Sequence, residues 1–495
     1  MPIRCRRVLV FILVFSFFIG AASGCKKEPI KGGSLVENSG NDYSDISSNG
    51  DVGDESGYDS DNSNGNEDNS RSEDASQSNN SETGGSDSRT GGTGTPGTTP
   101  GTTPGKTTSP GPNTGKKVIE IWDSESNETL TLAAVDYESK NKNVTISIKQ
   151  QGKTSLNMLK MAVAAKSAPD IVCMDQVYLV AAGNLSYLHD LTKYGANNVK
   201  SKFTDSCIKS ITYQNKLYGL PFDANTICFI YNKDIINQAG AAVPTNYNEL
   251  ITASNKIKAK FGTSKYSYTV PFDGWNNKNW MAFNYFFWLW RMGGEILTPD
   301  LKKAAFNSTE GVQALQMLVN MKNDGLAAPT YKHNEFFSGQ VGMIDIGSWT
   351  YNKVFGADKS GNFGVSLLPV LKTGVLPYSG LGLYCYGVTT GSKNVQEAYN
   401  FIEFYCTSSK YQLQYCKRNN FLPSLKGAYN DSFYSAPEWK VMIKQLGYSK
   451  FRPGVPNWDR MEESIADAVK LAVLGQKSPK EALDAAANNV NRLIK

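Results

Sequence analysis

The chain has 495 residues, with 51 Lys and Arg against 46 Asp and Glu, and a formal net charge of +5. The positive charges are scattered among acidic residues and form no basic stripe, which argues against nucleic-acid binding. The sequence has only two histidines and lacks the G-x-S-x-G and H-E-x-x-H motifs, so it does not carry those hydrolase signatures.

Residues 1–24 have the pattern of a secretory signal peptide. Three arginines precede the apolar run Val8–Ile19, which is too short for a membrane-spanning helix. Small residues then lead to Cys25 in the stretch GAASGC. This ending resembles the lipobox of bacterial lipoproteins, in which the cysteine is lipidated, although Ala22 stands where that motif usually has Leu. The alternative is an ordinary secreted protein, cleaved so that Cys25 remains as a spare thiol.

Residues 25–115 are rich in Ser, Asn, Asp, Gly, Thr and Pro. They offer too few apolar side chains to offset the entropy of ordering, so we expect a disordered tether anchored to the membrane through Cys25. The glycine-rich stretches 92–97 and 101–107 resemble phosphate-binding loops only in composition. Neither follows a strand or opens a helix, as a phosphate site requires.

The remainder of the chain opens with alternating strand and helix signals. Strands are expected at 118–122, 144–150 and 169–174, and helices at 127–141 and 155–168. This alternation is typical of a parallel α/β sheet, in which ligands bind outside the carboxyl ends of the strands. Trp122 and Asp123 end the first of these strands and Asp175 follows the third, so we expect them near one site.

Further elements follow along the chain. A turn at 220–225 feeds a strand, and residues 283–290 are so continuously apolar that they indicate a buried helix. Asn307 and Glu310 are spaced as a capping box for a helix that stops at Gly325. A later strand is expected to end at Trp349, and two amphipathic helices at the C-terminus.

Six cysteines lie beyond the tether, and none forms a C-x-x-C pair, so we expect no zinc site and, more broadly, no metal or cofactor. Their pairing cannot be assigned from sequence, and several lie in apolar, strand-like runs. Buried thiols are therefore the expected state. The six are Cys173, Cys207, Cys228, Cys385, Cys406 and Cys416.

Three segments carry a family resemblance over nearly all of 116–495. They are KLYGLPFDANTICFIYNKDI, FFSGQVGMIDIGSW and GVTTGSKNVQEAYNFIEFYCTS. In this order they resemble the carbohydrate-binding extracellular solute-binding proteins of bacterial ABC importers, the family that includes maltose-binding protein. The resemblance implies a two-lobed α/β fold with a hinge and an interlobe ligand cleft.

The resemblance also implies the domain organisation and the partners. Lobe 1 is expected to comprise 116–226 and 384–420, and lobe 2 to comprise 227–383 and 421–495. The chain would be a monomeric, non-enzymatic receptor on the extracytoplasmic face of the cell membrane, and it would deliver a carbohydrate, expected to be an oligosaccharide, to the permease subunits of an ABC transporter.

A sugar site needs aromatic plates for the apolar faces of the rings and polar groups for the hydroxyls. The resemblance supports Trp349 and Trp458 as stacking residues, and Asp273 and Trp275 lie in a stretch similar to a ligand-facing part of the second lobe. The candidate ligand-binding residues are Trp122, Asp123, Asp175, Asp223, Asn225, Asp273, Trp275, Trp349, Arg452 and Trp458.

Each candidate also has a simpler interpretation. A tryptophan is commonly buried in a core, and an Asp after a strand commonly caps a helix, as Asp175 could. Arg452 could bind a carboxylate ligand. Three other functions stay open: a cell-surface carbohydrate-active enzyme using Asp123 and Asp223, a structural or adhesive surface protein, and a receptor for a peptide, anionic or other non-sugar solute.

Overall fold

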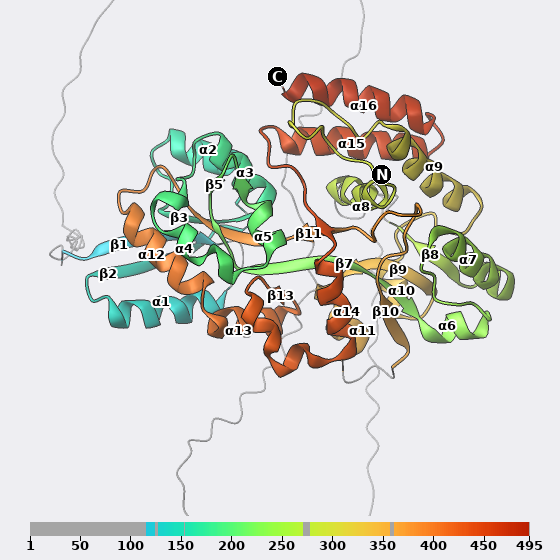
Figure 1. Ribbon diagram of the computed structural model, residues 1–495, viewed down its shortest axis with the longest axis horizontal. Coiled ribbons are helices and arrows are strands. Elements are labelled where there is room, and N and C mark those ends of the chain that lie inside the picture. Colours follow the sequence, from blue (N-terminus) through green and yellow to red (C-terminus); the bar gives the residue numbers. More distant parts are fainter. Residues whose placement is uncertain (1–114, 124–126, 153, 271–277, 357–360, 495) are drawn as a thin grey trace, which may run out of the picture. The chain divides into compact units, whose positions relative to one another are not determined.

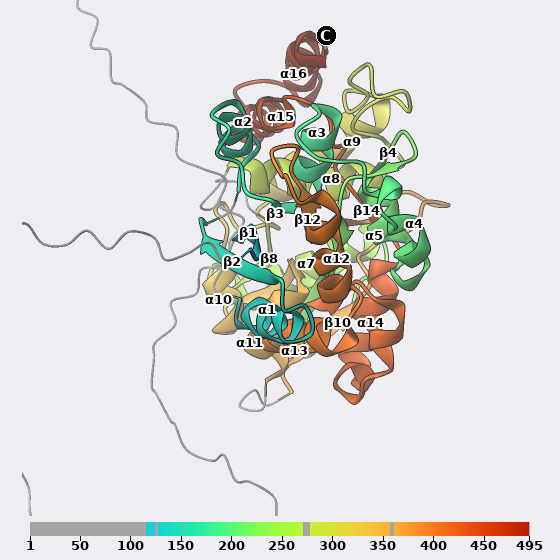
Figure 2. The ribbon, with the colours of Figure 1, turned by 90° about the vertical axis from the view of Figure 1, so that its left-hand side faces the viewer.

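The computed structural model describes residues 115–123, 127–152, 154–270, 278–356 and 361–494. These residues all belong to one compact unit, Ser56–Lys495. They form two large β-sheets, each with helices packed against it (Figures 1 and 2). Within the same ranges, no helix combines the length and the apolar character needed to cross a membrane.

The first sheet has the strand order β2-β1-β3-β12-β6. β1 pairs in parallel with β2 and β3, as the strand-helix-strand pattern predicts, and β12 pairs antiparallel with β3. Helices α2 and α3 lie on one side of this sheet, and α1, α12 and α13 lie on the other (Figure 2). The bounds are β1 Lys117–Asp123, β2 Val144–Gln150, β3 Ile171–Asp175, β6 Leu220–Pro221, β12 Tyr384–Val388, α1 Glu128–Lys140, α2 Leu156–Ala164, α3 Gln176–Asn184, α12 Val395–Cys406 and α13 Ser409–Asn419.

The helices that alternate with these strands begin at polar caps. The side chain of Asn127 accepts a hydrogen bond from the amide of Leu130 at the start of α1. Ser155 caps α2 and Asp175 caps α3 in the same way. Each cap satisfies an amide that the first turn of a helix leaves without a partner, which fixes where the helix starts.

The second sheet has the order β14-β11-β7-β9-β8, and β10 and β13 also pair with β7. β7 pairs antiparallel with β9, whereas β8 pairs in parallel with β9. Figure 1 shows α8, α15 and α16 gathered on one side of this sheet. The bounds are β7 Asp223–Asn232, β8 Tyr266–Thr269, β9 Val341–Gly347, β10 Phe363–Ser366, β11 Ser379–Gly382, β13 Leu422–Pro423, β14 Ser449–Lys450, α6 Lys233–Gln238, α7 Tyr247–Phe261, α8 Lys278–Arg291, α9 Thr309–Asn323, α10 His333–Phe337, α11 Tyr351–Phe355, α14 Pro437–Leu446, α15 Trp458–Val473 and α16 Pro479–Ile494.

Shorter elements complete the described fold. A small hairpin pairs β4 with β5, and two short helices precede it in the chain. Their bounds are β4 Thr212–Tyr213, β5 Lys216–Leu217, α4 Ala196–Val199 and α5 Asp205–Ser210. Single turns of 3₁₀ helix occur at Leu191–Lys193, Lys200–Lys202, Ser348–Thr350, Lys426–Asn430 and Ser432–Ser435.

Several boundary predictions are wrong, by one to four residues: the helix expected at 155–168 ends at Ala164, and the strand expected at 169–174 begins at Ile171. The cap of α9 is Ser308, whose hydroxyl accepts a hydrogen bond from the amide of Gly311, while the Asn307 amide group donates to Asp484 instead. β9 ends at Gly347 rather than at Trp349, because the chain turns into a 3₁₀ turn there. The predicted buried helix is confirmed as α8, with residues 283–290 buried throughout.

At two crossings between the sheets, a single residue separates the strand of one sheet from the strand of the other. β6 ends at Pro221 in the first sheet and β7 begins at Asp223 in the second. On the return, Leu383 alone separates β11 of the second sheet from β12 of the first. β13 then pairs with the first two residues of β7. Three separate segments of the chain therefore meet at the junction of the sheets.

Two clusters of buried apolar residues pack against opposite faces of the second sheet. Cys228 and Ile230 of β7 belong to the cluster that also fills the first sheet. Ile227 and Phe229, which alternate with them, belong to the cluster beneath α7, α8, α9, α15 and α16. Alternation along the strand sends successive side chains to opposite faces, so β7 contributes to both cores.

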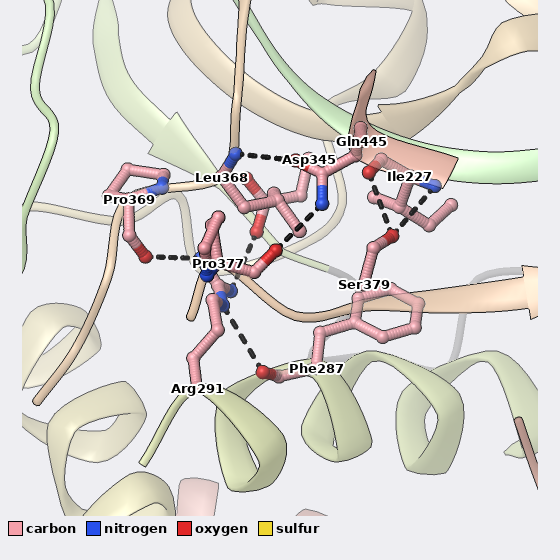
Figure 3. A network of polar contacts seen from close by, with 9 residues as sticks. All are labelled: Ile227, Phe287, Arg291, Asp345, Leu368, Pro369, Pro377, Ser379 and Gln445. Carbon is pink, nitrogen blue, oxygen red and sulfur yellow. Dashed lines mark hydrogen bonds and ion pairs between the residues drawn. The ribbon is translucent and has the colours of Figure 1, made fainter. Parts of the chain in front are cut away.

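A buried arginine ties the second sheet to α8. The Arg291 guanidinium donates to the Asp345 carboxylate of β9 at 3.1 Å and to the carbonyl oxygens of Phe287 and Pro369 (Figure 3). Arg291 and Asp345 are both fully buried. Burial raises the pKa of the Asp345 carboxyl, and the charge of Arg291 opposes that rise. Each charge is stabilised by the other, because neither group has access to water.

We expect Arg291→Met to lower the free energy of unfolding by about 3–5 kcal/mol, because it leaves Asp345 buried without its cation. Urea unfolding followed by circular dichroism measures the loss. The matched control is Lys480→Ala, which removes an exposed ion pair to Asp484 on α16 and should leave the unfolding midpoint unchanged. Equal effects of the two variants would contradict the assignment.

Candidate functional site

The ends of β1 and β3 lie side by side, since Trp122 of β1 is in register with Val172 of β3. This brings Asp123 and Asp175, the last residues of the two strands, to one edge of the first sheet. Trp122 and Asp123, however, are consecutive strand residues and therefore face opposite sides of the sheet. Trp122 is half-buried, and its indole nitrogen donates to Glu120 at 3.0 Å.

Asp123 belongs to a buried polar chain. Its carboxylate accepts a hydrogen bond from the Tyr386 hydroxyl at 3.2 Å, and the Asn127 amide group donates to the hydroxyls of Tyr386 and Tyr405. Burial, and then the charge of Asp123, raise the pKa of the Tyr386 phenol above its ordinary value. Tyr386 therefore remains protonated and keeps donating, which fixes the Asp123 carboxylate at the end of β1.

Asp175 and Arg452 lie together although 277 residues separate them. The Asp175 carboxylate caps α3 through the Val177 amide and also accepts a hydrogen bond from Arg452 at 2.8 Å. The second terminal nitrogen of Arg452 lies 3.5 Å from the carboxylate of Glu462 on α15. The guanidinium also lies over the ring of Phe283, 4.9 Å from its centroid. The capping interpretation of Asp175 is therefore correct, and the same carboxylate additionally forms an ion pair.

Asp223 and Asn225 lie where the chain changes sheets. The fully buried Asp223 carboxylate accepts a hydrogen bond from the backbone amide of Tyr384 at 2.7 Å, which ties the outgoing strand to the returning one. Asn225 accepts a hydrogen bond from the Ser348 hydroxyl at 3.0 Å. Asp223 thus fastens the junction, and Asn225 fixes the turn that carries Trp349.

Trp349 lies between the two cores. It is half-buried, packs against both apolar clusters, and meets the ring of Trp280 edge-on at 6.1 Å. Gly347 permits this position, because a Cβ atom there would come within 1.9 Å of the Trp349 ring. Trp458, the first residue of α15, is instead fully buried and packs against Phe286. In this conformation Trp458 is a core residue.

The remaining candidates lie outside the described residues. These are Asp273 and Trp275, together with Cys25, the signal peptide and residues 25–114 of the tether. The roles predicted for them stay predictions.

Sequence reasoning missed Glu462 and Tyr178. Glu462 lies one helical turn after Trp458, among apolar residues of α15 such as Met461 and Ile465, and a glutamate on such a face was a usable signal. Tyr178 of α3 packs against both apolar clusters, as Trp349 does. No sequence pattern indicates that contact, because it depends on how α3 meets the second sheet.

No group of three or more His, Cys, Asp and Glu side chains could hold a metal ion in the part of the chain that the structure describes. The six cysteines beyond the tether are all buried with free thiols, and burial raises the pKa of Cys207 to about 12. What the described residues bring together is a half-buried tryptophan, an amide and a buried set of charges where the sheets meet. That combination suits non-covalent recognition of a polar molecule with apolar faces.

We expect Asp223→Ala to lower the free energy of unfolding by about 1–3 kcal/mol, since it removes the buried carboxylate that accepts the hydrogen bond of the part-buried Tyr384 amide. Asp223→Asn keeps an oxygen acceptor and is expected to lose less. Asp205→Ala, which breaks an exposed pair with Lys426, is the control and should unfold like the native chain. Chemical denaturation measures all three, and an Asp223→Ala variant as stable as the native chain would contradict the junction role.

The sequence is similar to known binding proteins. A family model described as bacterial extracellular solute-binding protein matches residues 133–440. The galactooligosaccharide-binding protein of Bacillus subtilis (strain 168) is 24% identical over 400 residues, which cover 77% of this chain and 90% of that protein. The maltodextrin-binding protein MdxE of the same organism is 23% identical over 407 residues, covering 78% of this chain and 92% of that protein.

Solved structures show the same fold. The cyclic alpha-maltosyl-1,6-maltose binding protein from Arthrobacter globiformis superposes with a TM-score of 0.68 at 24% identity, covering 77% of this chain and 100% of that chain. The sugar-binding protein MalE from Xanthomonas citri has a TM-score of 0.67 at 19% identity, covering 76% of this chain and 97% of that chain. The predicted two-lobed α/β fold of maltose-binding-protein-like receptors is confirmed. With more than half of its length matched by the family model, this chain belongs to the bacterial extracellular solute-binding proteins.

Proposed function

We propose that this protein captures a carbohydrate, and specifically an oligosaccharide, between two lobes that close on it, and delivers the sugar to the permease subunits of an ABC transporter. The relatives named for galactooligosaccharide and maltodextrin support the ligand class. The lobes are proposed to comprise 116–226 with 384–420, and 227–383 with 421–495. The receptor is proposed to act as a monomer without enzymatic activity.

The observation that carries the proposal is the position of Trp349. A half-buried indole that packs against both cores can form a plate for the face of a sugar ring, with Trp280 bracing it edge-on. Asn225 lies close by through its hydrogen bond with Ser348 of the same turn. An aromatic plate with an amide group close by matches the alternation of apolar faces and hydroxyl edges in a sugar.

The pairing of Arg452 favours a neutral sugar over a uronate. Its terminal nitrogens already face the carboxylates of Asp175 and Glu462. A carboxylate ligand would have to displace one of them and leave a buried acid without its cation.

In a thermal-shift panel we expect neutral oligosaccharides to stabilise the protein and uronates to leave it unchanged. Ligand at 100 times its Kd adds about 2.7 kcal/mol of stability. Trp349→Ala should weaken binding of the best ligand by about tenfold or more, as loss of a central aromatic contact does. Tyr213→Ala, in the β4-β5 hairpin, should bind like the native chain.

Two results would count against this function. No stabilisation by any glycan would refute carbohydrate capture, and stabilisation by uronates alone would refute a neutral ligand. New reducing ends after incubation with the best glycan would instead indicate a carbohydrate-active enzyme.

We further propose that Cys25 carries a lipid that anchors the receptor to the extracytoplasmic face of the membrane, with residues 25–115 as the tether. Mass spectrometry of the mature N-terminus is expected to find a lipid-modified Cys25 as the first residue. Cys25→Ala should release the protein into the medium while leaving glycan binding unchanged. An unmodified Cys25 in the membrane-bound protein would contradict the anchor.

A further inference from the structure

One buried guanidinium serves two carboxylates that come from different parts of the fold. Arg452 follows β14 of the second sheet and donates to Asp175, the last residue of β3 in the first sheet, at 2.8 Å. Its other terminal nitrogen lies 3.5 Å from Glu462 on α15. The side chains are 5%, 10% and 0% exposed for Arg452, Asp175 and Glu462.

This charge cluster lies where α3 meets the second sheet's helices. Val177 of α3 belongs to the apolar cluster formed by α8, α15 and their neighbours, rather than to the cluster of its own sheet. The chain at Gly454 passes so close to α3 that a Cβ atom there would come within 2.3 Å of the Val180 side chain. We call this contact, formed by Val177, Val180, Gly454 and the Asp175–Arg452 pair, the α3 seam. Any opening of the two sheets at the α3 seam breaks the ion pair.

The two carboxylates compete for one cation. With both ionised, three buried groups carry a net charge of −1, and the ion nearer to Arg452 is Asp175. Burial raises the pKa of Glu462 to about 7, with Asp175 adding to the rise and Arg452 opposing it. Among the described residues, the Tyr178 phenol of α3 also interacts with this cluster and with Asp459 in the first turn of α15. Glu462 is thus the member that gains most from taking up a proton.

We propose that Glu462 is a positioning residue that determines whether Arg452 pairs with Asp175 across the α3 seam, so that proton uptake by Glu462 favours the closed arrangement of the two sheets. When Glu462 is protonated, the guanidinium is available to Asp175. When the seam opens, Asp175 departs, Arg452 turns to Glu462 alone, and Glu462 releases its proton to solvent. The inference rests on the proposed function only in that capture requires opening and closing.

The direction of the pH dependence follows from the two states. The pKa of Glu462 is about 7 in the arrangement that the structure shows, with the α3 seam formed, which we call closed. It is expected to fall towards its ordinary value of 4.5 when the seam opens and Arg452 pairs with Glu462 alone. Closing therefore takes up a proton, and the preference for the closed state over the open state is greatest below about pH 4.5. The closed-to-open ratio falls by about tenfold for each pH unit between these two values and levels off above pH 7.

The test uses the ligand-free full chain, with spin labels on two exposed sites, Ser139 of α1 and Lys477 after α15. A ketone-bearing amino acid at each site carries the label, so the native cysteines stay untouched. The distribution of distances between the two spin labels, measured by double electron-electron resonance between pH 5 and 8, should show the closed population falling as the pH rises. Glu462→Gln, which cannot ionise, should remain closed over this range, and Glu462→Asp should restore the pH response.

Glu463→Gln is the matched control, since its exposed carboxylate is adjacent on α15. It should keep the native response. Both this variant and Glu462→Gln retain the two histidines, so a response that is lost only in Glu462→Gln does not come from histidine titration. A native chain with no pH response, or a Glu462→Gln variant that responds as the native chain does, overturns the inference. Circular dichroism shows whether Glu462→Gln folds. If it does not, the inference is decided by comparing the pH dependence of the closed population in the native chain with that in Glu462→Asp.

This test separates the inference from the proposed function. A chain that closes on acidification but is stabilised by no glycan would refute carbohydrate capture and leave the role of Glu462 standing. A chain that binds a glycan and shows no pH response would refute only the role of Glu462.

Discussion

The junction of the two sheets is the constraint on which the other features depend. β7 begins at Asp223, directly after the chain leaves the first sheet, and within its ten residues it pairs with β13, β11, β9 and β10 in turn. The returning strand is held at the same place, because the Tyr384 amide donates to Asp223. Strand pairing and a buried acceptor thus fix both crossings within a few residues of each other. Asn225 and the Trp349 turn take their positions from this junction.

The alternation of strands and helices predicted much of the fold, because that signal is local. The first three strands and their helices follow from apolar periodicity and from caps such as Ser155. The cap of α9 was misplaced by one residue, since Asn307 and Ser308 are both good caps and only the contact of Asn307 with α16 distinguishes them. Such choices are made by tertiary packing, which a local pattern does not contain.

The candidate site could be predicted only in part. The sequence placed the candidate ligand residues Asp123, Asp175, Asp223 and Asn225 at strand ends and at the crossing between sheets, and the structure finds them there, buried. What these side chains contact depends on residues far away in the chain, as the 277-residue separation of Asp175 and Arg452 shows. Trp458 illustrates the same limit, because its place before a helix does not reveal that Phe286 covers it.

The two buried arginines differ in a way that bears on movement. Arg291 has one carboxylate and two backbone carbonyls as acceptors, all within the second sheet and the segments packed on it, so every partner moves with it. Arg452 has two carboxylates, and one of them belongs to the other sheet. The partners of Arg291 therefore keep their places when the sheets move relative to each other, whereas the proposed role of Glu462 requires a cation that is shared between the sheets. Buried charge therefore holds α8 to the second sheet at Arg291, and at the α3 seam it links the first sheet to the second.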